Sequence, residues 1–190
     1  MDRIEATIAV YERLRKHKYR ITVENGDVID LAFLRENYHH LAGYQHLSDM
    51  PIIQSPPGGT DAFYGRVKNG HITEKALSKS AKYNLIEKRL STFFELENIL
   101  SAGKQKIIIR FDKTKADTVI NAIYFLYKKN GAPYSPEYSV CMLFIGYDPH
   151  KKKYYPTTYV VEESNKYFND QDFLNCTIEV LAKQQKKHQQ

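Results

Sequence analysis

The part of the chain after Gly103 consists of strand-like segments separated by turn-forming residues. Five segments rich in β-branched and aromatic residues follow one another there: KQKIIIRF, TVINAIYFLYK, YSVCMLFIGYD, YYPTTYVVEE and NCTIEVLAK. Clusters such as Asn130-Gly131-Ala132-Pro133 favour turns between them. The run VCMLFIG is apolar on both faces, which predicts a central strand that is covered on both sides. The pattern therefore predicts an antiparallel strand meander.

Helical patterns dominate the chain before Gly103. Apolar residues recur at helical spacing over residues 3–17 and 34–48, and a hairpin with an Asn25-Gly26-Asp27 turn lies between them. The segment PIIQSPPGGT predicts a loop. Shorter helices are expected over 60–69 and 72–79, and a long one over 83–102 with Ile86, Leu90, Phe93 and Leu100 as its apolar stripe.

Helices followed by a meander predict an α+β fold in which the N-terminal helices pack on an antiparallel sheet. No linker or internal repeat divides the pattern. We therefore expect a single domain over residues 1–183, followed by a basic polar tail at 184–190.

The charge and residue usage favour an intracellular protein that binds a polyanion. The chain has 28 Lys and Arg against 22 Asp and Glu, a net charge of +6, and 15 Tyr without Trp. A basic surface attracts nucleic acid, and tyrosine rings suit stacking on bases. Cys141 and Cys176 lie in apolar segments, which indicates buried free thiols and a reducing, cytoplasmic compartment. No apolar run reaches the length of about 18 residues that a membrane helix needs.

Several common sites are absent from the sequence. It contains no GxxxxGK[ST], GxGxxG after a strand, CxxC or HExxH pattern. Two cysteines in separate strands do not form a zinc site. We therefore expect no metal and no cofactor.

The segment from Asn37 to Leu47 is the most informative for chemistry. It contains three histidines, His39, His40 and His46, on a predicted helix that also contains Gly43. Histidine transfers protons near neutral pH, whereas a glycine inside a helix indicates a close approach of another group to the backbone. At helical spacing His39, Gly43 and His46 share one face. Taken singly, each histidine could equally be an exposed or half-buried packing residue.

These residues resemble the Barnase–EndoU–Colicin–RelE-like nuclease domains of phages and mobile elements. The resemblance rests on the pattern N-Y-x-H-L-x-G-x-x-x-L at residues 37–47 and on S-x-x-Y-x-x-I-x-x-R-L at residues 80–90. A later Pro-x-Thr-aromatic element matches Pro156, Thr158 and Tyr159. The likeness extends from about residue 18 to residue 183.

The resemblance implies a helical layer on a sheet of four or five antiparallel strands, and an activity. Related nucleases cleave RNA without metal, using the substrate's 2′-hydroxyl as the nucleophile. Such a reaction needs a base, an acid and a cation for the phosphorane charge. On this basis His40, Arg89 and Thr158 are the expected catalytic residues. The expected substrate-binding residues are His39, His46, Lys79, Ser80, Tyr83 and Arg110.

Each of these assignments has a simpler structural alternative. Arg89 could be a salt-bridged helix residue, Lys79 an ordinary surface lysine, and Thr158 a strand former. Arg110 could face solvent rather than RNA. Because His39 and His40 are adjacent, a shift of one residue would transfer the catalytic role between them.

Three functions from different classes remain compatible with the sequence. The first is a metal-independent endoribonuclease, acting as a phage or mobile-element toxin or effector. The second is a module on the same fold that binds nucleic acid or protein without catalysis, and the third is a transferase that uses a nucleotide. RNA is the expected partner, and a protein inhibitor or a phage or host protein is a further one. The oligomeric state stays open.

Overall fold

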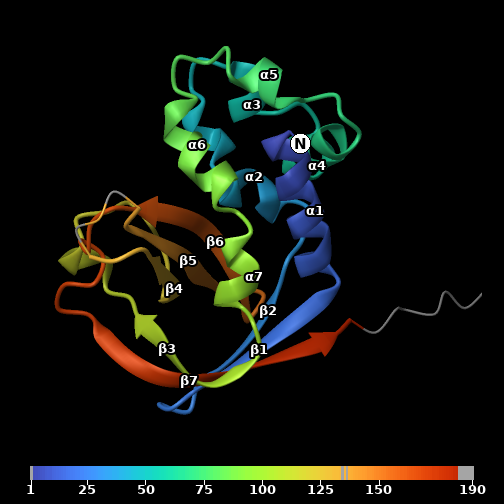
Figure 1. The fold of residues 1–190 in the computed structure, drawn as a ribbon. Coiled ribbons are helices and arrows are strands. Elements are labelled where there is room, and N and C mark those ends of the chain that lie inside the picture. The colour runs from blue at the N-terminus through green and yellow to red at the C-terminus, as the bar shows by residue number, and fades with distance from the viewer. Residues whose placement is uncertain (1, 134, 136, 184–190) are drawn as a thin grey trace, which may run out of the picture.

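A computed structural model describes residues 2–133, 135 and 137–183, so the expected tail at 184–190 lies outside the described residues. The helices are α1 Arg3–Arg15, α2 Asn37–Leu41, η1 Tyr44–His46, α3 Pro51–Gln54, α4 Gly59–Lys68, α5 Glu74–Leu77, α6 Asn84–Ser91, α7 Glu95–Ile99 and η2 Lys113–Lys115. The strands are β1 His17–Val23, β2 Val28–Ala32, β3 Gly103–Arg110, β4 Tyr124–Asn130, β5 Ser139–Asp148, β6 Lys153–Glu162 and β7 Asp172–Ala182. Figure 1 shows most of the helices gathered over one end of a strongly curved sheet.

The sheet contains seven antiparallel strands in the order β2-β1-β7-β3-β4-β5-β6, so the expectation of four or five strands is wrong. The difference comes from the N-terminal hairpin, because β1 pairs with β2 on one side and with β7 on the other. Tyr19 lies opposite Val180 in that second ladder. Strand β7, the last segment of the expected meander, pairs with β3 instead of β6, so the meander contains only β3 to β6 and β7 joins it to the hairpin. The mixed helix-and-sheet character is as expected.

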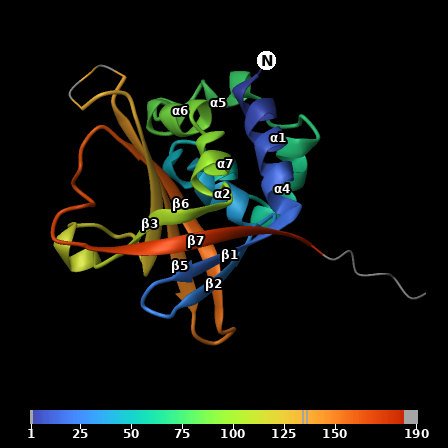
Figure 2. The same ribbon diagram turned by 60° about the horizontal axis from the view of Figure 1, so that its bottom comes forward.

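The curvature brings the two edge strands of the sheet close to each other. Strands β2 and β6 stand at opposite ends of the strand order, yet they are in contact. Figure 2 shows β2 beside the hairpin that β5 and β6 form. Helix α2 packs against β6 at this opening. The candidate site described below lies next to β6, near the place where the two edge strands approach each other.

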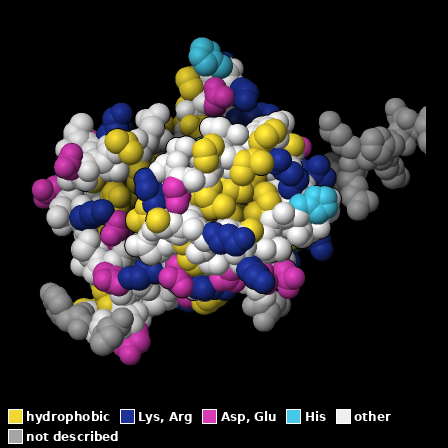
Figure 3. Space-filling view, turned by 90° about the horizontal axis from the view of Figure 1, so that it is seen from above, with side chains coloured by type: hydrophobic (Ala, Val, Ile, Leu, Met, Phe, Trp, Pro, Cys, Tyr) yellow, Lys and Arg dark blue, Asp and Glu magenta, His cyan; other side chains and the backbone are white. Residues whose placement is uncertain are grey.

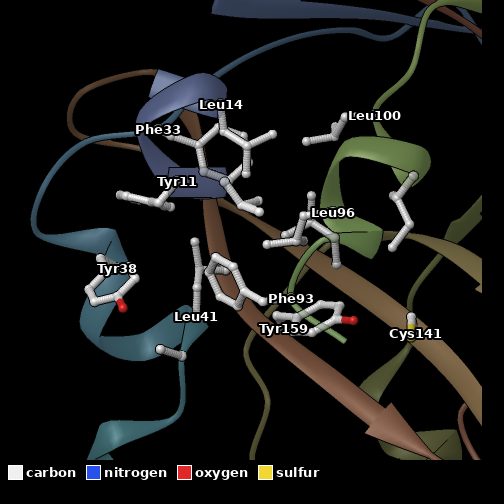
Figure 4. Close-up of a cluster of buried hydrophobic side chains, with 14 of the residues drawn as sticks. Tyr11, Leu14, Phe33, Tyr38, Leu41, Phe93, Leu96, Leu100, Cys141 and Tyr159 are labelled. Atoms are coloured by element: carbon white, nitrogen blue, oxygen red, sulfur yellow. The ribbon is translucent and has the colours of Figure 1, made fainter. Parts of the chain in front are cut away.

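Both faces of β5 are covered, as the apolar run predicts. Cys141, Leu143 and Ile145 belong to a large inner cluster beneath the helices, part of which is drawn in Figure 4. Met142 and Phe144 belong to a second, outer cluster. The outer cluster is largely aromatic and includes the loop residues Tyr167 and Phe168. Cys141 and Cys176 are buried free thiols, as expected.

The expected helix over 34–48 is interrupted at Gly43. Helix α2 ends at Leu41, and Gly43 has a left-handed φ of 84° before η1 begins. Its N–H donates to the carbonyl of His40 at 3.2 Å, a contact that closes the end of α2. Glycine adopts this conformation without a steric penalty, so it ends the helix here. The predicted common face of His39, Gly43 and His46 is therefore wrong.

The expected helix over 83–102 is interrupted as well, at Thr92. The Thr92 hydroxyl donates to the carbonyl of Lys88 at 2.7 Å. The hydroxyl of Tyr159 donates to the Thr92 carbonyl at 2.8 Å. The same carbonyl accepts a turn hydrogen bond from the N–H of Glu95 at 2.9 Å, and the N–H of Leu96 bonds to Phe93 instead, so α6 and α7 are separate. The apolar stripe is nevertheless buried as predicted, because Ile86, Leu90, Phe93 and Leu100 all belong to the inner cluster.

Two segments of the expected pattern differ locally. The loop over 51–60 contains the short helix α3, which begins at Pro51, a residue suited to the first helical position. The strand expected over 118–128 begins only at Tyr124. The residues before it form a loop in which Ala116 and Ile120 pack on the outer cluster. Of the described residues, none form a helix with the length and hydropathy that a bilayer crossing requires.

Candidate active site

Gly43 brings the backbone between α2 and η1 directly against Arg89 of α6. Gly43 is buried, and a Cβ atom at this position would lie 3.0 Å from Cδ and 3.2 Å from Nη1 of Arg89. It would also lie 3.2 Å from Cγ2 of Ile86. A side chain here would displace the arginine, which accounts for the close approach that a glycine in this segment predicts.

The guanidinium of Arg89 lies near Thr158 on β6. Nη1 of Arg89 is 3.5 Å from Oγ1 of Thr158, a long hydrogen bond. Arg89 forms no ion pair with a carboxylate of the described residues, and burial lowers its pKa. A guanidinium nevertheless stays protonated near neutral pH. An arginine partly removed from water without a counterion is well suited to bind a phosphate.

His40 and His46 lie on either side of the Gly43 turn, and His46 lies close enough to Arg89 and to His40 for both to affect its pKa. His40 is exposed at the end of α2, and His46 is half-buried in η1. Removal of water by the surrounding protein lowers the pKa of both imidazoles. The positive charge of Arg89 lowers the pKa of His46 further, as does His40. Both rings therefore favour the neutral form, which can accept a proton.

A β-bulge lies directly beside Thr158. Thr158 is opposite Phe144, whereas Pro156 is opposite the next residue of β5, Ile145, so Thr157 has no partner of its own. Bulges bend a strand and change the direction of neighbouring side chains. Thr158 is only 9% exposed, and α2 packs against the same strand. The bulge and α2 thus place Thr158 at the border between the sheet and the helical layer.

The structure places Arg89 beside Thr158 and His46, and His40 near His46. These residues lie on α2, η1, α6 and β6. Helix α2 contacts η1 and β6, and α6 contacts η1 and β6 as well. The assignment of these residues as a catalytic site remains a prediction. The combination of two neutral imidazoles, an unpaired guanidinium and a hydroxyl can bind a phosphate ester and transfer protons to and from it.

His39 lies outside this cluster. It is 2% exposed, its Nε2 lies 2.7 Å from the carbonyl of Ile53, and its ring packs edge-on against Phe63. Of the two adjacent histidines, only His40 faces the surface. These contacts place His39 where it stabilises the helical layer. Because the helix is interrupted at Gly43, the side chains of His39 and His46 do not share a face.

Ser80 and Tyr83 also make structural contacts away from the cluster. The Ser80 hydroxyl donates to Asp49 at 2.6 Å, and the Tyr83 hydroxyl donates to Glu74 at 2.8 Å. Lys79 is exposed beside Ser80. Arg110 is exposed at the end of β3 and borders a different depression with Lys113 and Lys115. The structure therefore does not bring these four residues to Arg89.

Gln45 is a neighbour of the cluster that sequence reasoning missed. Its side-chain Nε2 lies 3.3 Å from Nε2 of His46, and its Oε1 is buried without a hydrogen-bond partner among the described residues. An amide in this position orients the imidazole. The sequence signal is weak, because a glutamine beside a histidine is common. Glu162 and Tyr167, which raise the pKa of Arg89, have no sequence signal that links them to it.

The remaining surface charges do not form a single basic face on the side of the helices. Figure 3 shows the molecule from that side, with Lys and Arg side chains interspersed with Asp and Glu around a patch of hydrophobic side chains. No group of three or more His, Cys, Asp or Glu side chains with metal-binding geometry occurs within residues 2–133, 135 and 137–183.

A helical layer over a curved antiparallel sheet, with imidazole and guanidinium groups beside a sheet edge, is an arrangement suited to phosphodiester chemistry. The chain belongs to the family described as phage-Barnase-EndoU-ColicinE5/D-RelE like nuclease 4, whose model matches residues 3–189. The expected membership of the Barnase–EndoU–Colicin–RelE-like nucleases is thereby confirmed. Neither a curated protein nor a solved structure matches the chain significantly.

Proposed function

We propose that the protein is a metal-independent endoribonuclease whose active site contains His40, His46, Arg89 and Thr158. The observation that carries the proposal is the half-buried Arg89, which has no carboxylate partner among the described residues and lies beside Thr158 and His46. Membership of a nuclease family supports the same conclusion. An RNA phosphodiester provides both the negative charge and the 2′-hydroxyl that such a site requires.

The reaction assigns one function to each side chain. A neutral imidazole removes the 2′-hydroxyl proton, and the 2′-oxygen attacks phosphorus to form the 2′,3′-cyclic phosphate. The bond from phosphorus to the 5′-oxygen breaks, and a protonated imidazole donates a proton to that oxygen. Arg89 and Thr158 bind the non-bridging oxygens, where charge increases in the transition state.

We assign the base to His46 and the acid to His40. Burial and Arg89 both lower the pKa of His46, so His46 is held in the neutral form that a general base requires. His40 is exposed and can reload a proton from solvent. A nucleoside 3′-nitrophenyl phosphate tests the assignment, because its leaving group needs no proton. His40→Ala should retain most activity on it, whereas His46→Ala should lose about 100-fold or more on both substrates. The reverse pattern would exchange the two assignments.

The ribonuclease activity itself is tested with end-labelled single-stranded RNA in the presence of EDTA. The wild type is expected to produce 2′,3′-cyclic phosphate ends, and Arg89→Lys to lose about 100-fold or more, because lysine cannot make the bidentate contact. Replacement of the exposed His71 by Ala is the matched control and should leave cleavage unchanged. RNA that stays intact but shifts on a gel would instead identify a binding module.

We further propose that the enzyme acts as a toxin or effector of a phage or mobile element, in keeping with the family description. Induced expression of the wild type should slow bacterial growth and fragment cellular RNA, and Arg89→Lys should do neither. Equal growth of the two cultures at equal protein levels would contradict this role.

A further inference from the structure

A groove of about 700 Å³ opens between the two edges of the sheet, next to the candidate active site. On one side it is bounded by β2, and on the other by the turn between β5 and β6 and the start of β6. Figure 2 shows these two parts of the chain beside each other. The residues that matter for its chemistry are Lys18, Asp30, Asn37, Lys152, Lys153 and Tyr155.

The groove carries unneutralised positive charge on its β6 side. Asp30 is paired with Lys18 at 2.8 Å and with Arg20 at 2.9 Å. Asp148 accepts hydrogen bonds from the backbone of the turn and lies 3.8 Å from Lys151. Among the described residues, Lys152 and Lys153 have no carboxylate partner, and the remaining acid at the rim is the exposed Glu36.

Lys152 occupies a backbone conformation that favours a different residue. Its φ is 50°, in the left-handed region that glycine and asparagine adopt most readily. A lysine at this position of a tight turn is unfavourable for the turn itself. The turn by itself therefore does not account for a lysine at this position.

Tyr155 provides an aromatic surface at the same side of the groove. Its ring packs over Gly146 so closely that a Cβ atom there would lie 2.8 Å from Cζ and 2.9 Å from the hydroxyl oxygen. The ring is half-buried. Gly146 thus leaves room for one part of the ring, and the exposed part of the ring is available for stacking on a base.

The groove leads to the active site along two elements. Asn37 lines the groove and precedes His40 by three residues on α2, so the two lie on the same side of that helix. Tyr155 lines the groove and precedes Thr158 by three residues on β6, a distance of about 10 Å along a strand. A nucleic acid strand bound in the groove would therefore continue to the cluster around Arg89.

We propose that this groove binds the single-stranded RNA that flanks the cleaved bond, with Lys152 and Lys153 on backbone phosphates and Tyr155 stacked on a base. The inference rests on the proposed ribonuclease function and extends it: the substrate is an extended single strand, bound several nucleotides beyond the scissile phosphate. Contacts to phosphates and ring faces bind such a strand without reading its sequence.

Binding is measured with fluorescent 2′-fluoro RNA of about 12 nucleotides, which lacks the attacking hydroxyl and so stays intact. Lys152→Glu/Lys153→Glu should weaken binding about tenfold or more and reduce the slope of log Kd against log salt by about 1.4, the value for two single-strand phosphate contacts. Lys75→Glu/Lys104→Glu is the matched control, because both lysines are exposed, lie outside the groove and change the net charge equally. It should weaken binding less than about twofold.

Cleavage assays on two substrates separate this proposal from the ribonuclease proposal. The groove variant should cleave a dinucleoside phosphate as fast as the wild type, but should lose activity on the longer RNA. Lys152→Gly should weaken RNA binding while raising the melting temperature, since glycine relieves the left-handed conformation. If the groove variant failed to cleave either substrate, or bound RNA no more weakly than the charge control, the groove proposal would be wrong. Groove-dependent binding without any cleavage by the wild type would overturn the ribonuclease proposal alone.

Discussion

At the scale of single residues, Gly43 both ends a helix and leaves room for a neighbouring side chain. Its position in the sequence does not show which of the two requires a glycine. Its φ of 84° ends α2, and its missing side chain leaves room for Arg89. Gly59 offers a comparison, because it has a φ of 78° but a Cβ atom there would meet no other atom within 4 Å. The two glycines thus share the conformational requirement, and of the two only Gly43 has the steric one.

Gly43→Ala should therefore cost more than Gly59→Ala. Both changes place a side chain in a left-handed conformation, at about 1–2 kcal/mol. Crowding of Arg89 and Ile86 should add about 1–3 kcal/mol for Gly43→Ala and reduce RNA cleavage about tenfold to 100-fold. Urea denaturation and cleavage rates measure the two effects. Equal stability and equal activity of the two variants would show that Arg89 does not depend on Gly43.

His39 makes stability depend on pH. Burial lowers its pKa from the ordinary value of 6.5, so the unfolded chain binds the proton more tightly than the folded protein. Its contribution is present above pH 6.5 and is lost as the pH falls below that value; His40 and His46 act in the same direction. His39→Gln, which keeps a donor toward Ile53, should lose less stability between about pH 7.5 and about pH 5 than the wild type. The exposed His71→Gln should follow the wild-type curve in thermal denaturation, and an unchanged slope for His39→Gln would contradict this role.

At the scale of elements, the short helix α7 is attached to the sheet by an ion pair between the buried Glu95 and the partly exposed Lys128. Glu95 is 5% exposed, and its Oε2 accepts hydrogen bonds from Lys128 of β4 at 2.8 Å and from Asn98 at 2.7 Å. Glu97 on the same helix pairs with Arg13 of α1 at the surface. The two glutamates therefore differ mainly in burial.

Glu95→Gln should destabilise the protein by about 1–3 kcal/mol, because the hydrogen bond from Lys128 loses its charge assistance and an amide group is buried in its place. Glu97→Gln should cost less than about 1 kcal/mol, since an exposed pair is screened by solvent. Chemical denaturation of the two variants gives the comparison. Equal losses would mean that the pair to Lys128 contributes no more than a surface ion pair.

At the scale of the whole molecule, one strand separates two hydrophobic clusters. Leu143 points into the inner cluster and Phe144 into the outer one, and both are fully buried. Because both clusters pack on the same strands, they should unfold together.

Leu143→Ala and Phe144→Ala should both shift one cooperative transition, by about 2–5 and about 3–5 kcal/mol respectively. Differential scanning calorimetry tests this, because two clusters that unfold together give a single cooperative transition. A second transition in Phe144→Ala, with the first unchanged, would show that the outer cluster unfolds independently.

Much of the local structure follows from the sequence alone. The period of apolar residues predicted the buried stripe over residues 83–102 and the cover on both faces of β5, because burial requires an apolar surface wherever a neighbour packs. The same local pattern located the hairpin and the meander of β3 to β6, but it placed β7 wrongly, because β7 pairs with β1 and β3 instead of β6. The motifs selected His40, Arg89 and Thr158, which the fold does bring near one another.

Only the tertiary structure decided how these parts combine. Strand pairing uses backbone groups that every residue carries, so the pattern could not show that β1 pairs with β7 and raises the sheet to seven strands. The interruption between α6 and α7 involves Tyr159, a residue distant in sequence whose hydroxyl donates to the Thr92 carbonyl. Likewise, the burial of His39 beside an exposed His40 and the groove between β2 and β6 depend on contacts between remote segments. Such contacts are set by the packing of the whole chain, and local periodicity does not encode them.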